Sequence, residues 1–260
     1  MISKTKLKEL TGYKQQKRCS EEGVFVVEGV KMCAEVLAAK CAVKYICATN
    51  SWLSKQASLP TGAEVYEVDR EGLERLSGMK TPNEVWMLLP RLLSPLQATE
   101  AMHPQVEPMP DSRLILALDR IQDPGNLGTI IRTADWFGVR HIVCSPDTVS
   151  CYNPKVVQSS MGSLLRTHMD YRPLDEWLAR CGRPVYGALL DGDDLWEGTP
   201  VPLPAEGAVL VIGNESTGIR PEVRQHVSHR VKIPNLGGTA ESLNAAVACA
   251  ILTAELLRRK

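Results

Sequence analysis

Residues 114–137 read LILALDRIQDPGNLGTIIRTADWF, and this stretch decides the fold class. Its first five residues, Leu114 to Leu118, are all apolar and predict a strand buried on both faces. The loop from Asp119 to Gly125 contains a Pro-Gly pair, which is a turn signal, and leads into a predicted helix from about Asn126 to Phe137. A buried strand that runs through a short loop into a helix is typical of an α/β fold with a parallel sheet.

The same pattern continues toward the C-terminus. Further strands are predicted at residues 141–144, 185–189, 209–212 and 231–233, and a final helix from about Ser242 to Leu257. Alternation of buried strands with helices predicts a parallel sheet covered by helices on both faces.

The N-terminal part has its own pattern of strands and helices. Apolar runs at residues 24–27, 43–48, 64–68 and 85–89, with a helix at 29–39, indicate a small α/β unit. Residues 91–112 contain four prolines and no sustained periodicity, which predicts a linker. We therefore expect one domain at residues 1–90, a linker at 91–112 and a second domain at 113–260.

The composition is that of an ordinary globular protein. Of 260 residues, 30 are Lys or Arg, 30 are Asp or Glu, and 44% are hydrophobic. No apolar run approaches the roughly 20 residues of a membrane span, and the first residues, MISKTK, lack the apolar core of a secretory signal. We therefore expect a cytoplasmic protein without a membrane partner. The eight cysteines include no Cys-x-x-Cys pair, which favours buried reduced thiols over structural zinc.

The first 18 residues are locally basic although the whole chain is neutral. Six basic residues stand against Glu9 alone: Lys4, Lys6, Lys8, Lys14, Lys17 and Arg18. This cluster fits a surface that faces the phosphates of a nucleic acid, and it also fits the solvated face of a helix. Charge alone leaves both interpretations open.

Three polar segments follow predicted strands, where ligands of parallel sheets bind. In the first, Asn126 is suited to cap the helix and Arg132 lies in its second turn. The second, GNESTGI at 213–219, has two glycines that allow close approach of the backbone to a ligand. The third, IPNLGGTAESLNAAVA at 233–248, leads into a helix that Ser242 is suited to cap. Taken singly, the three also fit a surface arginine, a simple turn and a helix cap.

In this order and spacing, the segments resemble the three signature motifs of the SpoU/TrmH-type RNA ribose 2′-O-methyltransferases of the SPOUT superfamily. The resemblance runs from Leu114 to the C-terminus and includes NPKVVQSSMG at 153–162, which is similar to a further family block. Residues 1–90, especially FVVEG at 25–29, resemble the ribosomal-protein-like substrate-binding domain that often precedes it. The family pattern has methionine where Asn235 stands, arginine where Gln158 stands, and one residue fewer between Pro234 and Ser242.

The resemblance implies a fold, a cofactor and partners. It implies a parallel sheet whose C-terminal part forms a deep trefoil knot, S-adenosylmethionine bound in the knot loops, RNA as substrate, and a homodimer with its active site at the interface. No metal is required. The residues that match the family's cofactor-binding positions are Gly213, Asn214, Glu215, Gly218, Ile233, Leu243 and Asn244. The residues that match its catalytic positions are Asn126, Arg132, Glu215 and Ser242.

Methyl transfer to a ribose 2′-hydroxyl needs an aligned attack and removal of the hydroxyl proton. A guanidinium is a poor base because its pKa exceeds about 12, so we expect Arg132 to bind the neighbouring phosphate and stabilise the alkoxide. Ser242 then orients Arg132 or the hydroxyl, and Glu215 supports the loop.

Three alternatives accompany this hypothesis. Ribosomal RNA is the expected substrate because of the N-terminal domain, and transfer RNA is the alternative. A noncatalytic RNA-binding protein on the same fold is the second. A nucleotide-dependent oxidoreductase is the third, and the absence of the dinucleotide glycine fingerprint disfavours it.

Overall fold

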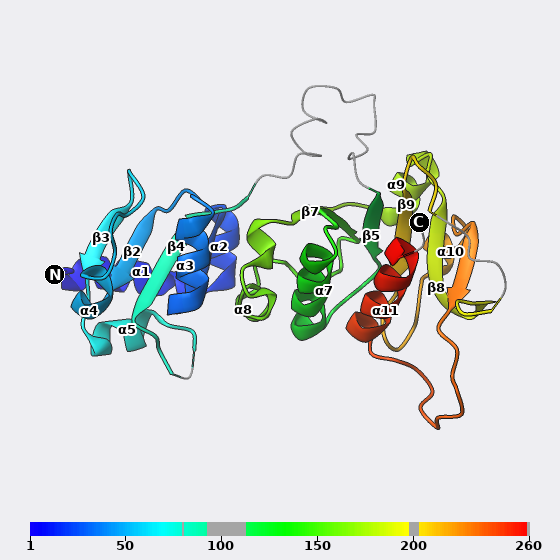
Figure 1. The fold of residues 1–260 in the computed structure, drawn as a ribbon. Helices are drawn as coiled ribbons and strands as arrows, with labels where there is room; N and C mark the ends of the chain where they lie inside the picture. The colour runs from blue at the N-terminus through cyan, green and yellow to red at the C-terminus, as the bar shows by residue number, and fades with distance from the viewer. Residues whose placement is uncertain (80, 93–112, 198–202, 259–260) are drawn as a thin grey trace. The chain divides into compact units, whose positions relative to one another are not determined.

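The structure is a computed structural model that describes residues 1–79, 81–92, 113–197 and 203–258 (Figure 1). The chain divides into two compact units. The first comprises Met1–Leu92 and Tyr152–Leu165, and the second comprises the rest. The predicted linker at 91–112 lies outside the described residues except for its first two positions. The predicted division into domains 1–90 and 113–260 stays a prediction.

The first unit is built on a four-stranded mixed sheet in the order β1-β4-β2-β3. Strand β4 is antiparallel to β1 and β2, and β2 is parallel to β3. The strands are β1 (Val24–Glu28), β2 (Tyr45–Ala48), β3 (Glu64–Glu67) and β4 (Val85–Pro90). The helices are α1 (Lys4–Thr11), α2 (Gln16–Glu21), α3 (Val30–Ala38), α4 (Asn50–Leu53), α5 (Arg70–Leu76) and α8 (Pro154–Ser160), with short 3-10 turns η1 (Gly12–Lys14) and η2 (Ser163–Leu165).

Helices α1 and α5 bury apolar side chains against one face of this sheet. Leu10 of α1 and Leu76 of α5 are almost fully buried in one cluster with Val24 and Trp86 of the strands. Two of the basic side chains of α1 and α2 pair with nearby carboxylates, Lys6 with Glu9 at 3.0 Å and Arg18 with Glu22 at 2.8 Å. The N-terminal helices therefore have both a structural apolar face and an exposed basic one.

The second unit is built on a six-stranded sheet in the order β10-β8-β9-β5-β6-β7, in which every neighbouring pair is parallel. The predicted parallel sheet is confirmed. The strands are β5 (Leu114–Leu118), β6 (His141–Cys144), β7 (His168–Tyr171), β8 (Val185–Asp194), β9 (Ala208–Ile212) and β10 (His229–Lys232). The helices are α7 (Pro124–Trp136), α9 (Leu174–Arg180), α10 (Pro221–Arg224) and α11 (Ala245–Arg258).

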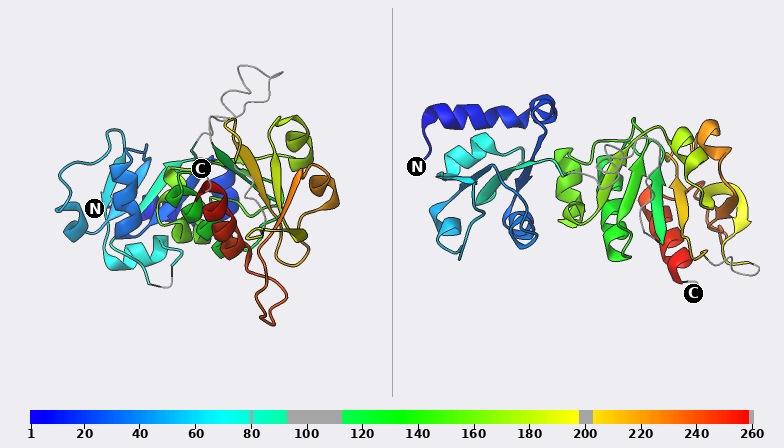
Figure 2. Two further views of the ribbon diagram at one scale, coloured as in Figure 1. Left: turned by 45° about the vertical axis from the view of Figure 1, so that its right-hand side comes forward. Right: turned by 90° about the horizontal axis from the view of Figure 1, so that it is seen from above.

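Helices cover both faces of the central strands. Strand β5 is buried at all five positions, and alternate residues of a strand point to opposite faces. Ile115 and Ala117 pack in one cluster with Trp177 of α9 and Val223 of α10. Helices α7 and α11 contact each other and lie side by side in Figures 1 and 2. This arrangement explains why the β5 sequence is continuously apolar.

Several element boundaries differ from the sequence prediction. Strand β7 was not predicted, because its sequence, HMDY, has no apolar run. Strand β8 continues to Asp194 because it pairs with β10 beyond an irregularity between Arg230 and Val231. Helix α11 begins at Ala245 rather than Ser242. The trefoil knot stays a prediction.

All eight cysteines are free; seven are buried, as predicted, and Cys41 is half-buried. Burial raises the pKa of Cys47 to about 12, although Lys6 acts to lower it. Burial likewise raises the pKa of Cys249 to about 12. Thiols with such pKa values are unreactive near neutral pH. Over the described ranges, no helix combines the length and apolar character needed to cross a bilayer.

Candidate active site

The 213–219 loop follows β9 and closes on itself. Asn214 and Gly218 exchange backbone hydrogen bonds of 3.2 and 2.9 Å, and Asn214 Oδ1 accepts from the Ser216 amide at 2.9 Å. A Cβ on Gly213 would lie 2.4 Å from the carbonyl carbon of Gly218, and Gly218 has a φ of +66°. Both glycines are therefore required by the closed shape of the loop.

A cavity of about 880 Å³ lies beside this loop. Small-molecule and cofactor sites commonly measure about 300–1,000 Å³. Its wall comes from residues 188–191 of β8, residues 212–219, and residues between Val231 at the end of β10 and Leu243, and it is completed by Arg224 of α10 and by Ala245, Ala248 and Leu252 of α11. Six of the seven predicted cofactor-binding residues line it: Gly213, Asn214, Glu215, Gly218, Ile233 and Leu243. Asn244 is outside the wall, whereas Ser242 is part of it.

The wall combines chemical features that a nucleoside cofactor needs. Ile212 and Ile233 supply apolar surface for a flat ring, and Glu215 and Asp191 supply carboxylates. An added Cβ on Gly218 would meet no atom within 4 Å, so this stretch of backbone is open to a ligand. The residues present therefore fit a ligand with an apolar ring and polar or positively charged groups.

Asn126 joins the three predicted motifs. Its Nδ2 donates a short hydrogen bond to Glu215 Oε1, and its Oδ1 accepts from Asn244 Nδ2 at 2.9 Å. The prediction that Asn126 caps helix α7 is wrong, because Asp123 Oδ1 accepts from the Asn126 amide at 2.8 Å. This frees the Asn126 side chain to connect the other two segments.

Asn244, and not Ser242, caps helix α11. Asn244 Oδ1 accepts from the amides of Ala246 at 3.0 Å and Val247 at 3.3 Å. The interpretation of Ser242 as a helix cap is therefore wrong, since the helix begins three residues later. Ser242 is exposed on the wall of the cavity.

Asn235 organises the loop that is one residue longer than the family pattern. Its Oδ1 accepts from the amides of Gly237 at 3.0 Å and Gly238 at 2.7 Å, and its Nδ2 donates to the carbonyls of Gly238 at 3.0 Å and Ala240 at 3.3 Å. A methionine could make none of these bonds. Asn235, which replaces the methionine of the family pattern, thus stabilises the longer loop through its own hydrogen bonds.

Within one copy of the chain, Arg132 is not part of the hydrogen-bonded group of Asn126, Glu215 and Asn244. It is exposed on α7 and is not a wall residue of the cavity. Among the described residues, no hydrogen bond or ion pair holds its guanidinium, and none joins it to Ser242. Trp136, four residues along the same helix, is 85% exposed and shares its face.

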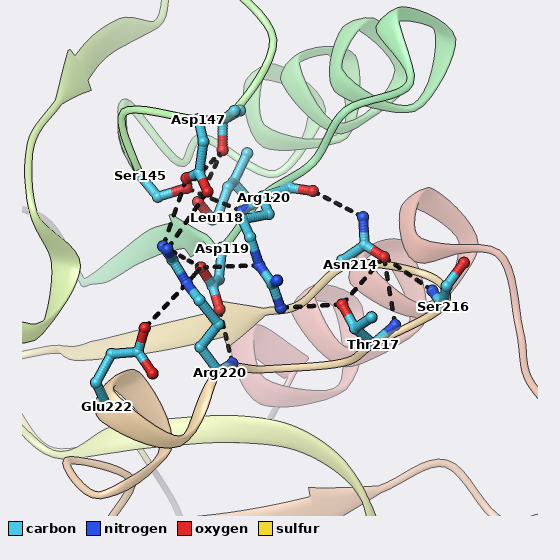
Figure 3. A network of polar contacts seen from close by, with 11 residues as sticks. Leu118, Asp119, Arg120, Ser145, Asp147, Asn214, Ser216, Thr217, Arg220 and Glu222 are labelled. Atoms are coloured by element: carbon cyan, nitrogen blue, oxygen red, sulfur yellow. Dashed lines mark hydrogen bonds and ion pairs between the residues drawn. The ribbon is translucent and has the colours of Figure 1, made fainter.

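Sequence reasoning missed a charged group beneath the loop (Figure 3). Asp119 is fully buried and accepts hydrogen bonds from the Arg220 amide and Nε, both at 2.8 Å. Arg220 also contacts Asp147 at 3.3 Å. Burial acts to lower the pKa of Arg220, but the hydrogen bond and charge of Asp119 outweigh it and raise that pKa. Asp119 directly follows an all-apolar strand, which indicates that its carboxylate is buried. A buried carboxylate needs a cationic or hydrogen-bonding partner, so this position could have pointed to the pair.

Comparison with known proteins supplies names for both parts of the chain. Residues 113–254 match the model of the SpoU rRNA Methylase family, and residues 4–86 match the MRM3-like substrate binding domain. The chain is 28% identical over 254 residues to the 23S rRNA (guanosine(2553)-2′-O)-methyltransferase RlmP of Bacillus subtilis, covering 96% of this chain and 95% of that protein.

Two solved structures are similar over nearly the whole chain. A TrmH-family protein from Porphyromonas gingivalis is 37% identical with a TM-score of 0.83, and the match covers 100% of each chain. The rRNA methyltransferase from Sinorhizobium meliloti with bound S-adenosylmethionine is 28% identical with a TM-score of 0.80, covering 99% of this chain and 97% of that one.

Proposed function

The chain belongs to the SpoU rRNA methylase family, and on this premise we propose that it transfers a methyl group from S-adenosylmethionine to a ribose 2′-hydroxyl of RNA. The cavity beside the 213–219 loop is the observation that carries the proposal. Ribosomal RNA is the proposed substrate, because the relatives from Bacillus subtilis and Sinorhizobium meliloti are rRNA methyltransferases. A cytoplasmic location is part of the same proposal.

The residues around the cavity divide into those that bind and those that hold the loops. Bound S-adenosylmethionine supplies a methyl group activated by its sulfonium. Ile233 and Leu243 offer apolar surface to the cofactor, and the open backbone at Gly218 offers polar groups. The hydrogen bonds from Asn126 to Glu215 and from Asn244 to Asn126 hold the three motifs in register, which aligns the reactants for attack.

Arg132 and Ser242 act on the RNA in this proposal. The 2′-hydroxyl must lose its proton as it gains the methyl group, so negative charge develops on its oxygen. The Arg132 guanidinium is permanently charged, and it binds the adjacent phosphate and stabilises that charge. Ser242, exposed on the cavity wall, orients the hydroxyl.

A homodimer is part of the proposal because Arg132 does not line the cavity of its own chain. Trp136 is 85% exposed on the same face of α7, and Val247 is 47% exposed on α11, which packs against α7. Exposed apolar side chains of this kind mark interaction surfaces. A second copy that covers them brings its Arg132 toward the cavity of the first.

The test is transfer of labelled methyl from S-adenosylmethionine to total RNA from cells that lack this protein, followed by mapping of alkali-resistant nucleotides. Label at one ribose of ribosomal RNA is the expected result. Label in transfer RNA alone would make transfer RNA the substrate in place of ribosomal RNA. Binding of S-adenosylhomocysteine without methyl transfer to free RNA or to ribosome assembly intermediates would favour the noncatalytic alternative. S-adenosylhomocysteine is expected to raise the melting temperature, whereas a nicotinamide nucleotide is not.

A further inference from the structure

The 213–219 loop is attached at its start, middle and end to the dipeptide Asp119-Arg120, which directly follows β5 (Figure 3). At the start, Asn214 Nδ2 donates to the Arg120 carbonyl at 3.0 Å. In the middle, Arg120 Nη2 donates to Thr217 Oγ1 at 2.9 Å. At the end, Arg220 binds the Asp119 carboxylate. One short stretch of chain therefore fixes the whole loop.

The attachment at the end of the loop is an ion pair between the fully buried Asp119 and the half-buried Arg220. Asp119 Oδ1 receives Arg220 Nε at 2.8 Å and Nη2 at 2.7 Å, while Oδ2 receives the Arg220 amide at 2.8 Å. The guanidinium and the backbone amide of Arg220 both donate to Asp119. Together these bonds fix the side chain of Arg220 and the direction of the backbone at this position. Asp147 binds the outer nitrogens at 3.3 and 3.4 Å. A lysine could not reproduce this geometry.

The attachment in the middle comes from a strained residue. Arg120 has a backbone φ of +57°, which is uncommon for residues other than glycine, asparagine and aspartate. Three hydrogen bonds hold it there: its amide donates to Ser145 Oγ at 2.9 Å, its carbonyl accepts from Asn214, and its guanidinium donates to Thr217. Strained backbone of this kind persists where the surrounding structure over-determines it, and it clusters at functional sites.

Neither arginine belongs to the wall of the cavity as the described residues form it, although Thr217 and Asn214 do. We propose that Arg220 and Arg120 are positioning residues that hold the 213–219 loop in the closed shape that receives the adenosyl cofactor, Arg220 by its bonds to Asp119 and Arg120 by its bonds to Asn214 and Thr217. This inference rests on the proposed function. The two arginines act through the loop, so they set the affinity for the cofactor and leave the chemical step at saturation unchanged.

The test uses the full-length protein and the variants Arg220→Gln and Arg220→Lys. Amide hydrogen exchange of residues 213–219, measured without cofactor, is expected to accelerate in Arg220→Gln. Its Kd for S-adenosylhomocysteine and its KM for S-adenosylmethionine are expected to rise about tenfold, since a charge-assisted hydrogen bond is lost. The kcat at saturating cofactor and the KM for RNA stay at the values of the unsubstituted protein. Arg220→Lys keeps the charge without the fork and gives an intermediate effect.

The matched control is Arg140→Gln, which removes another arginine of the same unit, paired with Asp135 at 3.5 Å. It is expected to change neither exchange of the loop nor the Kd. If Arg220→Gln fails to fold because Asp119 loses its nearest cationic partner and keeps only Arg120 at 4.0 Å, the double variant Asp119→Asn, Arg220→Gln replaces it. Arg120→Gln tests the middle attachment with the pair of Asp119 and Arg220 intact. Both are expected to show faster loop exchange and weaker binding.

A folded Arg220→Gln or double variant with unchanged loop exchange and unchanged Kd overturns the inference. An unsubstituted protein that fails to bind S-adenosylhomocysteine overturns the proposed function instead, and the exchange measurement still reports on whether the arginines hold the loop. Loss of kcat without a change in either KM also overturns the inference, because it would place Arg220 in the chemical step.

Discussion

Asn126 and Glu215 are 89 residues apart in the sequence, and the side-chain amide of the first donates a hydrogen bond to the carboxylate of the second. Asn244 completes the group by donating to Asn126 Oδ1 at 2.9 Å. Glu215 lines the cavity, Asn126 lies in the first turn of α7, and Asn244 caps α11. The positions of both helices are therefore coupled to the wall of the cavity.

Asn126→Asp is expected to disrupt this group, because it places a second carboxylate against Glu215 and removes the donor between them. We expect the affinity for S-adenosylhomocysteine to fall about tenfold and methyl transfer to fall further. Calorimetric titration measures the first quantity. The control is Asn50→Asp, which places a carboxylate against Glu67, a 3.2 Å partner in the first unit. Equal binding by Asn126→Asp and the unsubstituted protein would contradict a role for the group in shaping the cavity.

Arg132→Ala is expected to lower kcat for RNA methylation by about a thousandfold, because it removes the charge that we propose stabilises the developing alkoxide. The Kd for S-adenosylhomocysteine is expected to stay unchanged, since the proposed contact of Arg132 is with the RNA and not with the cofactor. Steady-state methyl transfer at saturating RNA and cofactor checks the first value. Arg140→Ala, another exposed arginine of the second unit, serves as the control. Near-normal turnover in Arg132→Ala would remove this residue from the chemistry.

Trp136→Lys is expected to produce a monomer without methyl-transfer activity. A charge at the most exposed aromatic position of α7 cannot be desolvated in an apolar interface without a large penalty. Sedimentation measures the mass in solution. Val65→Lys changes an exposed apolar residue of the first unit, 40% exposed, and is expected to leave the mass unchanged. A dimeric and active Trp136→Lys would place the interface elsewhere.

The double variant Lys4→Ala, Lys8→Ala is expected to weaken RNA binding and to reduce its dependence on salt. Both lysines are exposed on α1. If each contacts a phosphate, the slope of log K against log salt falls by about 0.7–0.9 per lysine. Filter binding at several salt concentrations checks this value. Lys55→Ala, an exposed lysine outside the basic N-terminal segment, is the control. An unchanged slope would favour the alternative of a merely solvated helix face.

The parallel sheet was predictable because its central strands are buried on both faces and so are continuously apolar. Strand β5 shows this at all five positions. Strand β7 at the edge of the sheet has the sequence HMDY and only one buried residue, so it left no periodic signal. Its place is set by pairing with β6, which is a tertiary contact.

Six of the seven residues predicted to bind the cofactor line the cavity, but the geometry that connects them was not predictable. Asn126 and Ser242 both occupy positions suited to capping, but the helices begin where Asp123 and Asn244 supply the capping oxygen. Competition between neighbouring polar residues decides such a boundary, and local propensity does not resolve it. The pair Asp119 and Arg220 is separated by 101 residues, so no short-range pattern could reveal it.

His141 is expected to make the protein less stable below about pH 6.5. Burial, and secondarily the charges of His168 and Arg183, lower its pKa to about 4, and the His168 ring lies 5.0 Å away across β6 and β7. The unfolded chain binds this proton at its ordinary pKa of about 6.5, and the folded chain does not. Stability is therefore fully present above that pH and is lost as the pH falls toward 4. His141→Gln is expected to recover about 2 kcal/mol of the loss between pH 7 and pH 4.5, measured by urea unfolding. An equal pH dependence in both proteins would show that other groups cause the loss.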